Sequence, residues 1–205
     1  MKGVARMLLL LPMLLALGVA LLRGGSPRAL AALPLRGGGF FLAALAVQVA
    51  LYLPLLRASA LAAHAGGALY AGSLALALVG ALRNAALGPA LWVATLGLAL
   101  NTVVIVANGG HMPVSAAAMR AVRGTATVRE IADARAFSNA RLAGPATRLT
   151  PLSDVIPVRL AGGVGNVYSV GDLLLAAGGA ALVYTATRRR APAGGGDGDG
   201  LRPAR

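Results

Sequence analysis

The sequence predicts an all-α integral membrane protein, a helical bundle of about five transmembrane helices with one long extramembrane loop containing short helices. Of its 205 residues, 58% are hydrophobic and 12% are charged, whereas soluble domains contain about 25% charged residues. The apolar residues form five uncharged runs bounded by Arg, Gly or Pro. Because an apolar helix of about 17 or more residues can cross the ~30 Å hydrocarbon core of a bilayer, lipid is the expected solvent. The expected spans cover about residues 7–22, 40–56, 65–82, 86–107 and 173–187.

The first span, about residues 7–22, is rich in leucine, and each leucine favours insertion by about 0.3–0.6 kcal/mol. Lys2 and Arg6 precede it, as basic residues precede the apolar core of a secretory signal peptide. No small-residue cleavage pattern follows, because the chain continues with Arg23-Gly24-Gly25. We therefore expect this segment to remain as a span, with cleavage as the alternative.

Two polar residues lie near the middle of expected spans, Gln48 in the second and Asn101 in the fourth. Each can hydrogen-bond to a neighbouring helix, a contact worth about 0.6–2 kcal/mol, or line a conduction path. Gly97, Asn101 and Asn108 share one face of the fourth helix by their spacing, so this face is expected to pack inward.

The arginines predict the membrane orientation. An arginine at the bilayer centre costs about 2.5–3.5 kcal/mol, so arginines mark span ends, and basic residues are enriched in short cytoplasmic loops. A topology with the N-terminus outside and the C-terminus inside puts seven basic residues of the short segments inside and three outside. The inner set is Arg23, Arg28, Arg36, Arg83, Arg188, Arg189 and Arg190, and the outer set is Lys2, Arg6 and Arg57. The long loop, residues 108–170, then lies outside.

Composition also bears on the source and on domain organisation. Arginine nearly replaces lysine, and Ala, Gly, Leu and Pro dominate, which favours a bacterial source and hence the inner (plasma) membrane. We expect residues 1–190 to form a single membrane domain. Residues 191–205 contain little that can be buried and predict a disordered tail.

Several function classes are disfavoured. The net charge is +13, but only 4% of residues are aromatic, so no stacking platform for nucleic acid is expected. The basic residues suit the lipid bilayer and its anionic headgroups as partners. There is no cysteine, and His64 and His111 stand apart from carboxylate clusters, so no metal site is expected. No P-loop or dinucleotide fingerprint occurs, and we expect no cofactor.

The long loop begins with Asn108-Gly109-Gly110-His111-Met112-Pro113-Val114, which is typical of a helix end because glycine accepts a left-handed backbone and proline prevents continuation. Short helices are expected over residues 116–123, closed by Gly124, and from 127 to about 137. Both are expected to lie at the membrane surface or on the spans.

Two carboxylates distinguish the rest of the loop. Asp154 lies between apolar residues flanked by Pro151 and Pro157 and needs a partner, either a nearby arginine such as Arg148 or Arg159 or a bound ligand or ion. Ser169 and Asp172 have the spacing of a helix capping box before the fifth span. As an alternative to this structural role, Asp154 and Asp172 together form a cation-attracting site.

Three motifs that follow one another along the chain resemble those of a known family. Asn108 to Val114 reads N-G-G-x-M-P-V, Leu152 to Pro157 reads L-x-D-x-I-P, and Ser169 to Asp172 reads S-x-G-D. The sequence thus resembles a bacterial domain-of-unknown-function family of small multi-pass membrane proteins. The resemblance implies a membrane location and no assigned activity. The positions that it singles out are Asn108, Gly109, Gly110, Met112, Pro113, Asp154, Pro157, Ser169, Gly171 and Asp172.

These observations favour a non-enzymatic membrane protein whose loop caps the bundle or binds a partner. The first alternative is a small-molecule or ion transporter that uses a polar path. Its residues would be Gln48, Asn101, Asp154 and Asp172. The second is a lipid-modifying enzyme, which would need His111 or Ser153 as base or nucleophile beside Asp154.

Overall fold

The computed structural model describes residues 10–133, 136–160 and 165–189, and the protein is mostly helical there. The long helices are α2 (Leu11–Leu22), α4 (Gly38–Tyr52), α6 (Ala60–Arg83), α7 (Pro89–Ala107), α8 (Ala116–Ala132) and α9 (Val170–Thr187). The short helices are α3 (Pro27–Ala31), α5 (Pro54–Arg57), η2 (Ala85–Leu87) and η3 (Thr150–Leu152). The strands are β1 (Met112–Val114), β2 (Ala140–Leu142), β3 (Ile156–Arg159) and β4 (Gly165–Tyr168). The start of the first expected span and the expected tail, 191–205, lie outside the described residues.

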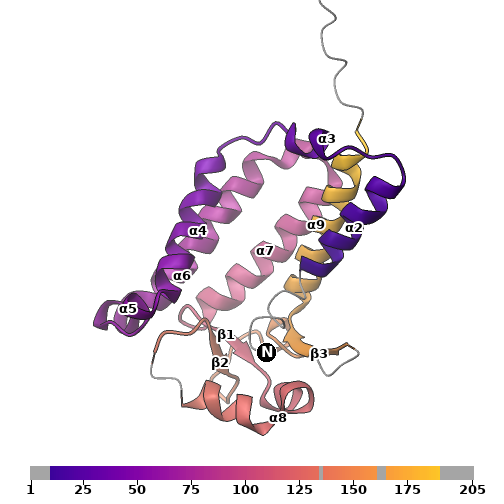
Figure 1. Cartoon of the computed structure of the whole chain (residues 1–205). Helices are drawn as coiled ribbons and strands as arrows, with labels where there is room; N and C mark the ends of the chain where they lie inside the picture. The colour runs from indigo at the N-terminus through magenta and orange to yellow at the C-terminus, as the bar shows by residue number, and fades with distance from the viewer. Residues whose placement is uncertain (1–9, 134–135, 161–164, 190–205) are drawn as a thin grey trace, which may run out of the picture.

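Five apolar helices form a bundle in which neighbours follow the order α4, α6, α7, α9, α2 (Figure 1). The segment between α7 and α9 lies at one end of this bundle, and we call its described residues from 108 to 169 the cap. The chain turns between α2 and α4 and between α6 and α7 at the opposite end (Figure 1). There the backbone N–H of Ser26 donates to the carbonyl of Thr187 at 2.8 Å and ties the end of α2 to the end of α9.

Three of the five expected spans are long and apolar enough to cross a membrane by length and composition, namely α6, α7 and α9. The helices α2 and α4 are apolar but have only 12 and 15 described residues. At 1.5 Å per residue, these helices reach about 18 and 22 Å, short of the ~30 Å hydrocarbon core. Five complete spans are therefore not present within the described ranges.

Proline and glycine account for the differences between the expected and observed helix bounds. Pro54 puts Leu53 in an extended conformation, so α4 ends at Tyr52 instead of near residue 56. Gly88, with φ of 118°, separates η2 from α7, which begins at Pro89 and not at 86. Ser59 accepts a hydrogen bond from the backbone N–H of Ala62, so α6 starts five residues before the expected position 65.

Glycines allow α7 and α9 to pack closely. A Cβ at Gly97 of α7 would overlap the carbonyl oxygen of Gly171, and a Cβ at Gly178 of α9 would overlap the backbone of Ala94. Small residues at helix contacts are typical of helices that pack in lipid, where close backbone approach replaces the hydrophobic driving force. The inward packing expected for the face with Gly97 and Asn101 is present.

The cap contains two small sheets, so the expected all-α class is wrong for this segment. Strands β1 and β2 are parallel, β3 and β4 are antiparallel, and a further bridge pairs Val114 with Asp154. The prolines at 113 and 157 prevent helix formation, and pairing satisfies the backbone groups of these short stretches. The cap has its own apolar core, centred on Val114, Met119, Val122, Val128 and Val167.

The two short helices expected in the loop are joined into α8, with a kink at Gly124. This glycine has φ of 80° and ψ of 170°, outside the helical region. The second half ends at Ala132 instead of near residue 137, and Phe137 is buried against Leu51 and Ala62 at the foot of the bundle. The kink lets both halves of α8 cover the strands of the cap (Figure 1).

Candidate functional site

Asn108 ties the cap to the end of α7. Its Nδ2 donates to the carbonyls of Val104 at 2.8 Å and Arg148 at 2.9 Å, and its Oδ1 accepts from the backbone N–H of Arg148 at 2.9 Å. One side chain therefore adds a bond to a carbonyl of the last helical turn and holds the bend at Arg148, 40 residues away.

The two glycines that follow turn the chain under α6. Gly109 and Gly110 have φ of 67° and 85°, in the left-handed region that favours glycine. A Cβ at Gly110 would overlap the backbone of Gly67, so two glycines meet where α6 passes the start of the cap.

Strand β1 then places the segment around Asp154. Met112 and Val114 are buried, and the carbonyl of Pro113 accepts from the backbone N–H of Asp154 at 3.0 Å. The carbonyl of Asp154 accepts in turn from the N–H of Ser115 at 2.9 Å. These backbone bonds direct the Asp154 side chain without using its carboxylate. Pro157 lies farther along in β3, opposite Val167, and is exposed.

The capping box expected at the start of α9 is present. Ser169 Oγ accepts from the N–H of Asp172 at 2.9 Å, and Asp172 Oδ2 accepts from the N–H of Ser169 at 3.3 Å. Asn101 of α7 joins the same group, because its Nδ2 donates to Asp172 Oδ1 at 2.7 Å and its Oδ1 accepts from Ser169 Oγ at 2.8 Å. Gly171 is required here, since a Cβ would overlap the Asn101 side chain.

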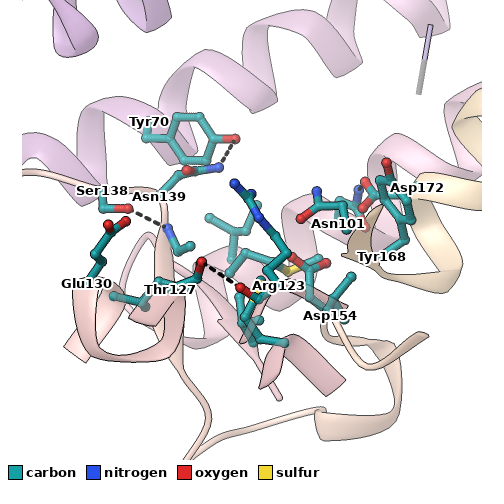
Figure 2. Close-up of a pocket in the computed structure, with 18 of the residues that line it drawn as sticks. Tyr70, Asn101, Arg123, Thr127, Glu130, Ser138, Asn139, Asp154, Tyr168 and Asp172 are labelled. Atoms are coloured by element: carbon teal, nitrogen blue, oxygen red, sulfur yellow. Dashed lines mark hydrogen bonds between the residues drawn. The ribbon is translucent and has the colours of Figure 1, made fainter. Parts of the chain in front are cut away.

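A cavity of about 580 Å³ lies between the end of the bundle and the cap (Figure 2). Bundle and cap each contribute polar side chains to its lining. The polar residues from the helices of the bundle and from α5 are Gln48, Tyr52, Arg57, Tyr70, Asn101 and Asp172. Those from the cap are Arg123, Thr127, Glu130, Ser138, Asn139, Asp154, Asn166 and Tyr168. The volume is within the range of small-molecule sites, about 300–1,000 Å³.

Asp154 has an unusual environment in this cavity. Its Oδ1 is buried and, among the described residues, is the only buried side-chain nitrogen or oxygen without a hydrogen-bond partner. Burial, with a smaller contribution from the nearby Asp172, raises the pKa of Asp154 to about 8. Neither Arg148 nor Arg159, the arginines expected as its partner, donates to Oδ1, and the Arg159 guanidinium donates instead to the carbonyl of Ala121.

Arg123 supplies a positive charge to the same cavity. It lies on α8 just before the kink, and Figure 2 shows its guanidinium extending toward the bundle side of the cavity. Within the described ranges the guanidinium has no hydrogen bond or ion pair, and the residue is half-buried.

A second polar network crosses the cavity wall. Tyr52 donates its hydroxyl to Asn139 Oδ1 at 2.6 Å, and Asn139 Nδ2 donates to the Tyr70 hydroxyl at 3.2 Å. Nearby, Gln48 Nε2 donates to Ser73 Oγ at 3.1 Å, so this polar residue also makes a bond between helices. The two tyrosines, Asn139 and Arg123 could not be identified from the sequence, because no motif connects positions on α4, α6, α8 and just before β2.

The residues required by the lipid-modifying alternative are not together. His111 lines a separate cavity of about 420 Å³, where Nδ1 lies 2.7 Å from the carbonyl of Ser138 and burial lowers its pKa. Ser153 is fully buried and donates to the carbonyl of Leu149 at 3.3 Å. Neither side chain lines the cavity that contains Asp154. In the described part of the chain, no group of three or more His, Asp or Glu could hold a metal ion.

The structure thus brings the three motifs to one end of the bundle. Asp154 and Asp172 line the same cavity, together with Gln48 and Asn101. Met112 also lines it. Ser169 orients Asp172 and Asn101. The chain beside the cavity takes its course from four other motif residues, Asn108, Gly109, Gly110 and Pro113.

The chain belongs to the family of unknown function DUF5317, whose model matches residues 32–184. This match includes all three motifs and the whole cavity lining. Neither the search of curated proteins nor the search of solved structures found a similar protein.

Proposed function

We propose that this member of the family of unknown function is a multi-pass integral membrane protein that binds a small polar solute between its bundle and its cap, without catalysing a reaction. The observation that carries the proposal is the cavity of about 580 Å³ with the unpartnered Oδ1 of Asp154 in its wall. A buried polar atom without a partner costs about 1–3 kcal/mol, and a bound donor would recover this cost.

The membrane location rests on the apolar surface of the helices. Leu14, Leu42, Leu61, Leu96 and Leu173, one from each of the five helices of the bundle, are all exposed. A soluble protein rarely exposes apolar patches this extensive, whereas acyl chains would cover them. The shorter helices α2 and α4 would cross with help from their neighbours or by local thinning of the bilayer.

The proposed setting is the inner membrane of a bacterium, with the N-terminus and the cap outside and the C-terminus inside. Its support is the excess of basic residues in the short segments at the end opposite the cap. Arginines there, such as Arg28 and Arg83, suit anionic lipid headgroups as partners.

Single-cysteine labelling tests this orientation, since the chain has no native cysteine. Thr125 is exposed on the cap and Ala32 is exposed at the opposite end. With an impermeant maleimide on intact cells, we expect the Thr125→Cys variant to react and the Ala32→Cys variant to react only after lysis. The opposite pattern would reverse the topology.

Solute binding is tested by thermal unfolding of the detergent-purified protein with cationic, anionic, zwitterionic and neutral solutes. We expect a saturable rise of Tm with at least one class. Ala140→Phe, which fills the cavity, should abolish the rise, whereas Ala117→Phe, exposed on α8 outside the cavity, should keep it. The proposal fails if no class raises Tm or if both variants respond alike.

Transport is the second candidate, because the four residues expected to form a polar path, Gln48, Asn101, Asp154 and Asp172, all line this cavity. A transporter would move the bound solute into vesicles, and Asp154→Asn would stop this flux while the amount of folded protein is unchanged. Binding without flux in wild-type vesicles would favour a receptor role.

A further inference from the structure

We infer that the cavity takes a small zwitterion, with an ammonium group against Asp154 and Asp172 and an anionic group at the guanidinium of Arg123. This inference rests on the solute-binding function proposed above and specifies the class of solute.

The first observation is that two carboxyl groups and a guanidinium line one cavity without an ion pair between them. Asp154 comes from the cap and Asp172 from α9, whereas Arg123 comes from α8. In the residues that the structure describes, no ion pair joins Arg123 to either carboxylate. A buried polar or charged group without a partner is unfavourable, so Asp154 Oδ1 and the Arg123 guanidinium each call for one.

The second observation concerns the unused acceptor capacity of the two carboxylates. Asp154 Oδ1 has no donor, and each oxygen of Asp172 has one, from Asn101 and from Ser169. A carboxylate offers about four lone-pair sites, and an ammonium group carries three N–H donors. An ammonium beside these groups would supply a donor to Asp154 Oδ1 and share another with Asp172.

The third observation concerns Arg123, whose guanidinium has five N–H donors in a planar fork. Such a fork matches the two oxygens of a carboxylate or a phosphate. Figure 2 shows Arg123 directed into the cavity, away from the cap surface. An anion here would supply the partner that the described residues do not.

A solute with a single charge of either sign would leave part of this site without a partner. A lone cation would leave Arg123 unpaired, and a lone anion would leave Asp154 Oδ1 without a donor. Tyr52, Tyr70 and Asn139 supply hydroxyl and amide groups to the same cavity, suited to the uncharged middle of a solute.

This chemistry has two sources at a membrane surface. A free solute, such as an amino acid or an amino-phosphate, carries both charges, and so does the headgroup of phosphatidylethanolamine. The probes are therefore glycine, γ-aminobutyrate and O-phosphoethanolamine as free zwitterions, with ethylammonium and acetate as single-charge controls. Nanodiscs of phosphatidylethanolamine or of phosphatidylglycerol supply the lipid comparison.

The experiment measures Tm for wild type and for four variants in detergent. Asp154→Asn and Arg123→Gln each remove one ionisable end of the site. Asp133→Asn, just after α8, and Arg120→Gln, on α8, are matched controls at exposed positions outside the cavity. We expect at least one free zwitterion to raise Tm by about 5–10 °C at 100 times its Kd, as a ligand of a chain of this size should. Both cavity variants should lose this rise, both controls should keep it, and the single-charge solutes should act weakly.

The outcomes separate the two proposals. If ethylammonium acts as strongly as the zwitterions and Arg123→Gln keeps the response, the cavity is a cation site, so the inference is wrong and solute binding stands. If phosphatidylethanolamine alone stabilises the protein and both cavity variants lose the effect, the headgroup is the zwitterion. If no zwitterion in either form stabilises wild type, the inference is overturned. A lack of response to every class of solute overturns solute binding as well.

Discussion

At the scale of single residues, Asp154 differs most from its surroundings. Its backbone is held by Pro113 and Ser115, yet its Oδ1 has no partner. The titratable groups that face it are Asp172 and two tyrosines, Tyr70 and Tyr168, with Arg123 in the same cavity. Asp172 is bonded at both oxygens, so of the two carboxylates it is Asp154 that responds more to a change of pH or ligand.

The raised pKa of Asp154 predicts how stability depends on pH. Its pKa is about 8 in the folded protein against 3.8 ordinarily, so between these values the folded state binds more protons than the unfolded state. Folding stability therefore falls as pH rises through this window. We expect the Tm of the detergent-purified protein to fall less from about pH 5 to about pH 8 in Asp154→Asn than in wild type.

The matched control for this experiment is Asp133→Asn, because Asp133 is exposed at the end of α8. Its Tm should follow the wild-type dependence on pH. Parallel profiles for wild type and Asp154→Asn would show that this carboxylate titrates normally.

At the scale of elements, two of the long helices end in the same way, with an asparagine that bonds both to the last helical turn and to the backbone of a distant loop. Asn84 follows α6 and donates to the carbonyls of Gly80 and Arg36, both at 2.8 Å, while its Oδ1 accepts from the N–H of Arg36 at 2.7 Å. Asn108 follows α7 and makes the corresponding bonds to Val104 and Arg148. Each asparagine ties the end of a helix to a loop, one at each end of the bundle.

Limited trypsin digestion of two variants, Asn108→Ala and Asn84→Ala, tests these asparagine contacts, and each variant is the control for the other. Asn108→Ala removes the bonds to Arg148, and we expect this to loosen the cap by about 1–2 kcal/mol. Trypsin should then cleave after Arg148 about 5–30 times faster. Cleavage after Arg36 should rise only in Asn84→Ala. Equal acceleration at both arginines in either variant would indicate global loosening instead.

At the scale of the whole molecule, small residues fill the contacts between helices and large apolar side chains point outward. Ala20, Ala44, Ala94 and Ala176 are buried in the bundle. The larger apolar side chains are mostly on the outside, where a soluble fold would expose polar ones. This arrangement suits a bundle whose solvent is lipid, because acyl chains are as apolar as leucine and close backbone contact provides the association energy.

The single tryptophan provides a test at this scale. Trp92 is half exposed, at 53%, and lies in the first turn of α7, at the end opposite the cap. In bilayers of brominated phospholipids we expect its fluorescence to be quenched, more strongly by bromine near the headgroups than by bromine near the bilayer centre. Emission equal to that in unbrominated lipid would place Trp92 away from acyl chains and contradict the membrane proposal.

Much of the fold and part of the candidate site could be predicted from the sequence. The capping box of Ser169 and Asp172 was predictable because its partners are three residues apart. The helix end at Asn108 was predictable from the glycines that follow it, but its bonds to Arg148 were not. Arg123, Tyr52, Tyr70 and Asn139 were missed, because a network between distant segments leaves no local pattern.

The sequence by itself determined the helical class, the apolar runs and the residues that end them, because hydrophobicity, proline and glycine act over a few neighbouring positions. The tertiary structure alone decided that the loop pairs its short strands and folds over the end of the bundle. That packing puts Asp154, Asp172 and Arg123 around one cavity. The physical reason is that a cavity, and the charges left unpaired in its wall, depend on contacts between segments that are distant in the chain.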